Sequence, residues 1–150
     1  MDNDARGIGP IAKLPVFLDL AGRRAVLAGD SNGIAWKAEL IAAAGADVTV
    51  FMPAASEALE RLAAAGVAAG SLHLVARRWQ ESDLAGAALA TGDFEDTEEA
   101  EAFHAAAHRA GVIVNTVDKA ATCDFFFGSI VSRSPIVIGI TTNGTAPILG

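Results

Sequence analysis

An aspartate that directly follows a run of β-branched residues is the first candidate for chemistry in this chain. Residues 112–117 read Val-Ile-Val-Asn-Thr-Val, and Asp118 comes next. A carboxylate at the C-terminal end of a buried parallel strand lies where open α/β sheets bind their ligands. There it can act as a general base or a metal ligand. The alternative is a solvated strand-end acid, or a cap for the next segment.

A glycine-bearing turn near the amino end is the second candidate. Residues 29–33 read Gly-Asp-Ser-Asn-Gly and lie between an apolar run and a helical pattern. In a dinucleotide-binding turn, successive glycines permit the tight turn, the approach of backbone to the pyrophosphate, and close helix–strand packing. Here the spacing is G-x-x-x-G, and the middle glycine is absent. The turn therefore indicates either a nucleotide site or a plain strand–helix connection.

Two histidines and one cysteine are weaker candidates. His104 and His108 are four residues apart on an expected helix, a spacing that can bind a metal. No cysteine or second acid accompanies them on that face, which favours a solvated helix surface, and no metal site is predicted. Cys123 lies beside the three phenylalanines at 125–127 and is expected to be a buried small hydrophobe.

The elements that must position these residues alternate along the chain. Apolar, β-branched runs predict strands at residues 14–20, 25–28, 47–51, 72–76, 87–91 and 112–117. Pro15 restricts the first of these to an edge or a strand start. Helices are expected over 33–44, 56–66 and 96–111, the last opened by Asp96 and Glu99 at a capping-box spacing. This alternation predicts an α/β, Rossmann-like, doubly wound parallel sheet.

The last third of the chain has a different pattern. Two β-branched runs joined at residues 133–135 predict an antiparallel hairpin. We therefore expect a Rossmann-like nucleotide-binding domain over 14–117 and the start of a smaller unit over 118–150, with residues 1–13 as a loose arm. The hairpin is too apolar to stand in water as an edge ribbon, which predicts that it lies at a homodimer interface.

Composition narrows the range of partners and compartments. The 150 residues are 52% apolar and carry a net charge of -7, which disfavours nucleic-acid binding. The single cysteine excludes an internal disulfide and suits a reducing compartment. No apolar run reaches the length of a transmembrane helix, and acids stand at the amino terminus where a signal peptide has bases. We expect a soluble, cytoplasmic protein with no membrane partner.

Several segments together resemble one known family, the siroheme synthases. The resemblance is to their precorrin-2 dehydrogenase/sirohydrochlorin ferrochelatase module and covers residues 14–149. It rests on Leu-Pro-Val-Phe-Leu-Asp-Leu at 14–20, Ala-Gly-Ala-Asp-Val-Thr-Val at 44–50 and Val-Asn-Thr-Val-Asp at 114–118. The most specific match runs from Cys-Asp-Phe-Phe-Phe at 123–127 to Gly-Thr-Ala-Pro-Ile-Leu at 144–149.

The resemblance implies an enzyme and a set of site residues. Members of this family are NAD-dependent homodimers that oxidise the tetrapyrrole precorrin-2 to sirohydrochlorin, and many also insert ferrous iron. One aspartate serves both steps, and it falls on Asp118. NAD is the implied cofactor, with predicted binding residues Gly29, Asp30, Ser31, Asn32, Gly33, Pro53 and Ala54. The family continues past residue 150 into helices that complete the dimer and the tetrapyrrole cleft, and some members add a methyltransferase domain. The chain is therefore expected to be a truncated module.

Departures from the family pattern fall around the cofactor. Of three consecutive family glycines only Gly29 remains, with Asp30 and Ser31 in place of the others. Trp36 replaces an arginine, and Phe94 replaces a threonine. Weak NAD binding is predicted from these changes. Two alternative functions remain: a degenerate, non-catalytic nucleotide-binding or dimerisation module of a fused siroheme synthase, and an NAD-sensing regulatory domain.

Overall fold

The computed structural model describes residues 3–4 and 7–143, and these belong to two compact units. The larger unit is Asp19–Phe126. The smaller unit contains the described residues up to Leu18 and those from Phe127 onward. The predicted division into domains at 14–117 and 118–150 remains a prediction, because residues 144–150 lie outside the described part of the chain.

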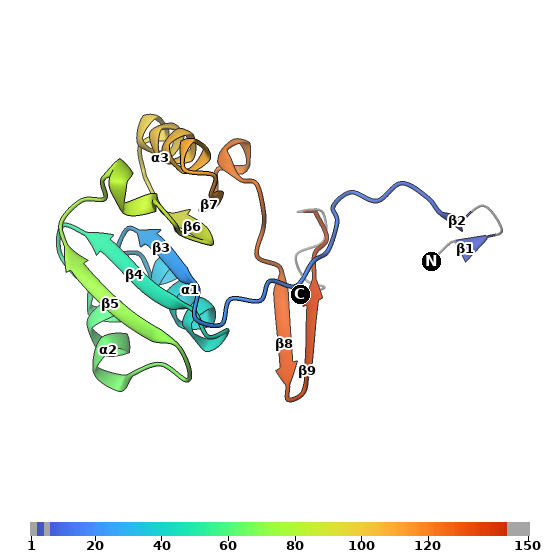
Figure 1. The fold of residues 1–150 in the computed structure, drawn as a ribbon, viewed down its shortest axis with the longest axis horizontal. Helices are drawn as coiled ribbons and strands as arrows, with labels where there is room; N and C mark the ends of the chain where they lie inside the picture. The colour runs from blue at the N-terminus through green and yellow to red at the C-terminus, as the bar shows by residue number, and fades with distance from the viewer. Residues whose placement is uncertain (1–2, 5–6, 144–150) are drawn as a thin grey trace. The chain divides into compact units, whose positions relative to one another are not determined.

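A five-stranded parallel sheet forms the centre of the larger unit (Figure 1). Its spatial order is β5-β4-β3-β6-β7, made by Ser71–Ala76, Asp47–Met52, Arg24–Ala28, Leu89–Gly92 and Ile113–Thr116. The chain enters at the central strand β3, builds outward to β5 and returns to β6 on the other side of β3. This is the doubly wound order of Rossmann folds, so the predicted fold class is confirmed.

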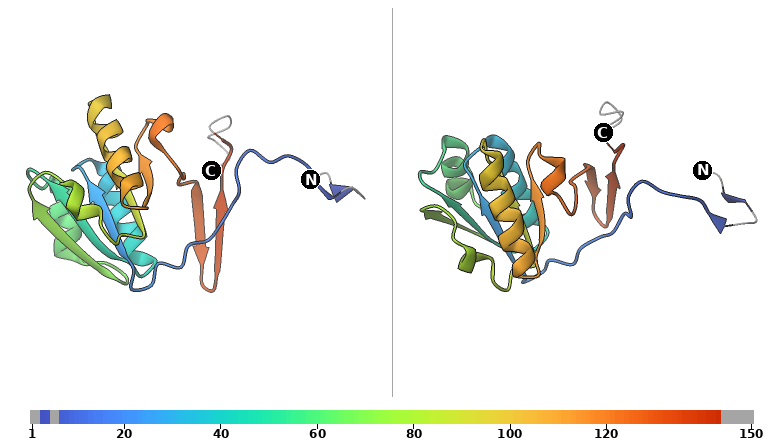
Figure 2. Two further views of the ribbon diagram at one scale, coloured as in Figure 1. Left: turned by 45° about the horizontal axis from the view of Figure 1, so that its top comes forward. Right: turned by 90° about the horizontal axis from the view of Figure 1, so that it is seen from above.

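Helices cover both faces of this sheet (Figure 2). The helices α1 (Asn32–Ala43) and α2 (Glu57–Ala65) pack on one face, and α3 (Thr97–Arg109) packs on the other with the short 3₁₀ turn η1 (Glu81–Leu84). Each α-helix begins at a polar cap, because Ser31, Ser56 and Asp96 accept hydrogen bonds from backbone N–H groups of the first turn. Within the described residues, no helix has both the length and the apolar character that a membrane crossing requires.

Side-chain alternation divides the core between the two faces. Neighbouring residues of a strand point to opposite sides of the sheet. Val26 and Ala28 of β3 pack on the α3 side, in one cluster with Phe94, Phe103 and Val114. Leu27 of β3 and Ile34 of α1 are fully buried as well. Because β3 is covered on both faces, its last four residues are all buried.

The smaller unit contains the hairpin that the sequence predicts. Strand β8 (Ser129–Arg133) pairs antiparallel with β9 (Ile136–Ile140), and Arg133 lies opposite Ile136. Within the predicted loose arm, β1 (Asn3–Asp4) pairs with β2 (Gly7–Ile8), so part of the arm has a regular ladder.

Two local predictions are wrong. Residues 14–20 form no strand; Leu14 and Phe17 are about three-quarters exposed, at 77% and 76%, and Pro15 has no N–H for a ladder. The predicted capping box of α3 is also absent. Asp96 caps the helix through Glu98 N, whereas the Glu99 carboxylate accepts hydrogen bonds from more distant side chains.

Candidate functional site

The candidate site lies where the strand order reverses, at the C-terminal ends of β3 and β6. From β3 the chain runs through α1 to β4, and from β6 it runs through α3 on the opposite face to β7. The two connections diverge and leave a cleft of about 210 Å³. Open α/β sheets bind ligands in this crevice. The cleft is lined by residues 28–30, Phe51 and Pro53, Arg78 and Trp79, residues 93–95, and Glu99.

Gly29 makes the turn out of β3 possible. Its φ of +123° lies in the region that L side chains rarely adopt, and a Cβ there would lie 3.0 Å from the carbonyl oxygen of Asp93. Its N–H donates to the Phe51 carbonyl at 3.0 Å, and Asp93 N donates to the Ala28 carbonyl at the same distance. The turn is therefore held between the ends of β4 and β6.

The rest of the glycine turn forms the start of helix α1. The Ser31 hydroxyl accepts a hydrogen bond from Ile34 N at 3.1 Å and caps α1. Gly33 has ordinary helical backbone, and a Cβ there would lie 3.6 Å from Ser31 Oγ, so packing does not require a glycine. Of the predicted cofactor-binding residues, Gly29, Asp30 and Pro53 line the cleft, and Ser31, Asn32, Gly33 and Ala54 do not.

An aromatic cluster forms the floor of the cleft and was missed by sequence reasoning. Trp79 packs edge-on against Phe103 with ring centroids 5.0 Å apart, and Phe94 lies 5.2 Å from Phe103. Gly92 leaves space for the Phe94 ring, because a Cβ at position 92 would lie 2.4 Å from Cε2 of that ring. Phe94 therefore adds an apolar wall to the cleft. Phe94 was singled out by its departure from the family pattern, but Trp79 carries no local signal.

Acids dominate the polar lining. Asp30, Asp93, Glu95 and Glu99 line the cleft beside one cationic side chain, Arg78. The Arg78 guanidinium donates to Glu99 Oε1 at 2.8 Å, and Trp79 Nε1 donates to the same oxygen at 3.2 Å. Since Arg78 is paired with Glu99, the remaining carboxylates give the cleft a net negative charge. Such a cleft repels a pyrophosphate and suits a neutral, hydroxyl-bearing group.

Asp118 lies after β7 at the same edge of the sheet and does not line the cleft. It is exposed and has a φ of +58°, the left-handed region that Asp tolerates better than most residues. Asp118 interacts electrostatically with Lys37 of α1. Burial lowers the pKa of the Lys37 ammonium below its ordinary value, and the negative charges of Asp93, Asp118 and Cys123 oppose that shift. The predicted catalytic aspartate and Asp93, which lines the cleft, thus both influence the same ammonium group.

Cys123 holds the outer edge of β7, from which Asp118 extends. The Cys123 Sγ accepts from Thr116 N at 3.2 Å and lies 3.1 Å from the Thr116 carbonyl oxygen. Asn115 Nδ2 donates to the Phe125 carbonyl at 3.0 Å. Cys123 is half-buried and hydrogen-bonded, so the prediction of a simple buried hydrophobe was incomplete. Its contacts occupy backbone groups of an edge strand that the sheet leaves unpaired.

The prediction for His104 and His108 was wrong in one respect, because an acid does lie beside them. The chain after β7 brings Asp124 to these histidines, with His108 Nε2 2.7 Å from Asp124 Oδ2. The acid that the helix itself does not supply thus comes from a segment 16 residues further along.

Comparison with known proteins agrees with this geometry. A family model described as "Putative NAD(P)-binding" matches residues 16–129. The siroheme synthase of Nitrosospira multiformis is 36% identical over 137 residues, which cover 91% of this chain and 29% of that protein. The siroheme synthase of Pseudomonas aeruginosa is 36% identical over 136 residues (91% and 28%), and that of Psychrobacter arcticus is 31% identical over 135 residues (90% and 24%).

The chain spans less than a third of the length of these curated relatives. A solved structure, SirC, precorrin-2 dehydrogenase, has a TM-score of 0.67 to this chain at 21% sequence identity. The match covers 91% of this chain and 65% of the other. That likeness establishes a common fold.

The Lys37 environment gives a direct test of the site geometry. Asp93→Asn and Asp118→Asn should each lower the pKa of Lys37 further, because each removes a charge that favours the ammonium. Asp30→Asn is the matched control and should leave that pKa unchanged. Titration of the lysine side-chain resonances by NMR measures all three. An unchanged Lys37 pKa in Asp118→Asn would place Asp118 away from this cluster.

Proposed function

This chain belongs to the NAD(P)-binding family whose model matches residues 16–129, and from that membership we propose that it is the nucleotide-binding part of an NAD-dependent precorrin-2 dehydrogenase. The proposed reaction is the oxidation of precorrin-2 to sirohydrochlorin. The similarity to siroheme synthases over 91% of the chain supports this substrate. The observation that carries the proposal is that the Gly29 turn and Asp118 lie at one edge of the sheet, after β3 and β7 respectively.

The residues of the cleft fit one part of NAD better than another. A volume of about 210 Å³ is below the roughly 300–1,000 Å³ of ordinary ligand pockets, so the cleft accommodates a part of a dinucleotide. The apolar floor of Phe51, Trp79 and Phe94 suits an adenine ring, and carboxylates beside it can accept hydrogen bonds from ribose hydroxyls. Gly29 lets backbone approach the pyrophosphate, and Asp30 opposes it by charge.

Asp118 is the proposed catalytic residue. Dehydrogenation removes a hydride and a proton from the tetrapyrrole, and NAD, when bound, accepts the hydride. The Asp118 carboxylate accepts the proton as a general base. Precorrin-2 is a polyanion, so a carboxylate at its site needs nearby cations; Lys37 and the adjacent Lys119 supply them.

The proposal extends to three finer properties. Insertion of ferrous iron into sirohydrochlorin is included, because the family resemblance assigns both steps to the residue at Asp118. A homodimer is included because the apolar side chains of the hairpin are exposed on this chain. A cytoplasmic location is included because a single cysteine suits a reducing compartment.

Two measurements distinguish the proposed dehydrogenase from the alternative functions. A rise in melting temperature with NAD separates the dehydrogenase and the NAD-sensing domain from a non-catalytic module that has lost the nucleotide. Oxidation of precorrin-2 then separates the dehydrogenase from the sensor. Family membership and similarity to siroheme synthases favour the dehydrogenase.

Removal of the Asp30 charge should strengthen NAD binding. Asp30→Asn should lower the NAD dissociation constant at least about tenfold, roughly 1.4 kcal/mol, because a carboxylate in the cleft repels the pyrophosphate. Isothermal titration calorimetry measures the change. Glu60→Gln removes the same charge from exposed α2, and its NAD affinity should match that of the parent. Equal affinities in Asp30→Asn and the parent would contradict the electrostatic argument.

Loss of Asp118 should affect chemistry rather than cofactor binding. Asp118→Asn should retain NAD affinity, since Asp118 does not line the cleft, and should slow precorrin-2 oxidation roughly 100-fold or more, the usual scale for a general base. Asp47→Asn, at the N-terminal end of β4 and so at the opposite edge of the sheet, is the control and should keep the parent rate. If Asp118→Asn also keeps that rate, Asp118 is a solvated strand-end acid.

The hairpin should mediate pairing of two copies. Ile136, Ile138 and Ile140 alternate along β9 and so share one face, with exposed fractions of 60%, 48% and 40%, and an apolar surface of this kind marks a contact. Ile138→Lys should convert the dimer to a monomer in sedimentation-velocity experiments, because a charge would be buried at the interface. Ile113→Thr changes an exposed side chain at the start of β7 and should leave the dimer intact. A parent chain that is monomeric at high concentration would refute the assignment.

A further inference from the structure

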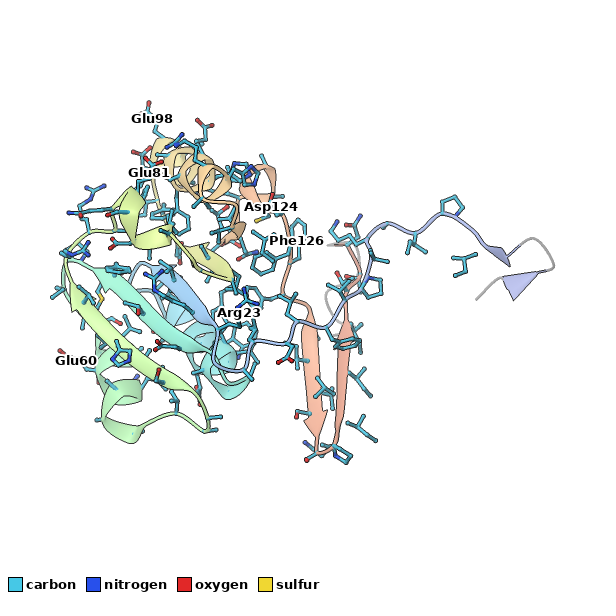
Figure 3. All side chains as sticks on the ribbon, in the orientation of Figure 1. Arg23, Glu60, Glu81, Glu98, Asp124 and Phe126 are labelled. Carbon is cyan, nitrogen blue, oxygen red and sulfur yellow. The ribbon has the colours of Figure 1, made fainter. Side chains whose placement is uncertain are left out.

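Three potential metal ligands, two from α3 and one from the segment after β7, lie close together. Figure 3 labels Asp124, the ligand from that segment. His104 and His108 lie one helical turn apart, with ring centroids 4.0 Å from each other. Asp124 approaches them from the segment after η2 (Ala120–Thr122). One ligand atom from each of the three residues lies within 4.8 Å of the others. This is a two-histidine, one-carboxylate set, which binds divalent transition metals.

The Asp124 carboxylate is held in place by the backbone of β7. Asp124 N donates to the Val114 carbonyl at 2.7 Å, and Val114 N donates back to Asp124 Oδ2 at 2.9 Å. These two bonds fix both the main chain and the side chain of Asp124 against an edge strand. Outer-shell hydrogen bonds of this kind orient the ligands of metal sites. Asp124 Oδ2 also lies 2.7 Å from His108 Nε2, and Oδ1 faces both imidazoles.

The distances fit a tetrahedral ion after small adjustments. Asp124 Oδ1 lies 2.9 Å from His108 Nε2 and 3.7 Å from His104 Nε2. Bonds of about 2.0–2.2 Å to a tetrahedral Zn²⁺ place neighbouring ligand atoms about 3.3 Å apart. Each of these two separations therefore needs to change by only about 0.4 Å, and the two histidine nitrogens lie within 4.8 Å of each other. Side chains exposed by 25% for His104 and 48% for His108 have room to move.

Both Nε2 atoms face the Asp124 carboxylate, at 2.7 Å for His108 and 3.7 Å for His104. A divalent cation among these atoms would bond all three groups at once. The cluster also lies apart from the nucleotide cleft, since none of its residues lines that cleft and Val114 is near the start of β7, whereas Asp118 follows its end.

We propose that His104, His108 and Asp124 bind one divalent transition-metal ion, with Zn²⁺ as the best match and water at the fourth position. The ion cross-links the C-terminal half of α3 to the segment that covers the edge of β7. This site is independent of NAD and of the tetrapyrrole, so its test does not depend on the proposed function.

Metal titration of the chelator-treated 150-residue chain tests the proposal. Zn²⁺ should bind one to one in calorimetry and raise the melting temperature, and Co²⁺ should give the visible absorption of a four- or five-coordinate ion. His104→Ala, His108→Ala and Asp124→Asn should each weaken Zn²⁺ binding by about 100-fold. Asp124→Asn keeps a side-chain oxygen for Val114 N, so this variant separates ligation from folding.

The third histidine supplies the control. His73 lies on β5 beside Asp47, with 3.3 Å between His73 Nε2 and Asp47 Oδ1. It does not belong to the three-residue cluster of His104, His108 and Asp124. His73→Ala should bind Zn²⁺ as the parent does. The proposal is overturned if the parent shows no saturable binding up to millimolar Zn²⁺. It is equally overturned if binding survives in both His104→Ala and His108→Ala.

Discussion

The close approach of the β3–α1 turn to the end of β6 is the contact on which the candidate site depends. Asp93 N bonds to the Ala28 carbonyl, and the Asp93 carbonyl oxygen lies 3.0 Å from the position that a Cβ of residue 29 would take. Gly29 lacks that atom and has a φ of +123°, which allows this close approach. Asp30, which follows the turn, and Phe94, which follows β6, both line the cleft. A side chain at position 29 would be strained by the positive φ and would crowd the Asp93 carbonyl.

Charge divides the site into two environments. The cleft at the end of β3 collects carboxylates around an aromatic floor, and its Arg78 is engaged by Glu99. On the side of β7, burial lowers the pKa of the Lys37 ammonium, and the charges of Asp93 and Asp118 oppose that shift. Asp93 also lines the cleft. The charges near β7 are therefore mixed, whereas those of the cleft are mainly negative.

The exposed edge of β7 connects these features to the rest of the fold. An edge strand presents unpaired N–H and C=O groups, and the segment that follows β7 forms hydrogen bonds with several of them. Cys123 bonds to both backbone groups of Thr116, and Asp124 bonds to both of Val114. The same segment thus covers the strand, supports the turn that carries Asp118 and presents a carboxylate to α3.

Local patterns in the chain were enough to predict the five strands of the parallel sheet, the Ser56 cap and the place of Asp118 after the last of these strands, because β-branched runs and capping residues act over a few neighbours. The same patterns predicted a strand at 14–20, but this segment has no pairing partner among the described residues and forms no strand. The pairing of Glu99 with Arg78 and Trp79, and of Asp124 with His108, joins residues 16 to 21 positions apart. Such contacts arise from the crossing of α3 over the sheet. No periodicity encodes them, so the polarity of the cleft and the histidine–aspartate cluster emerged from the folded chain alone.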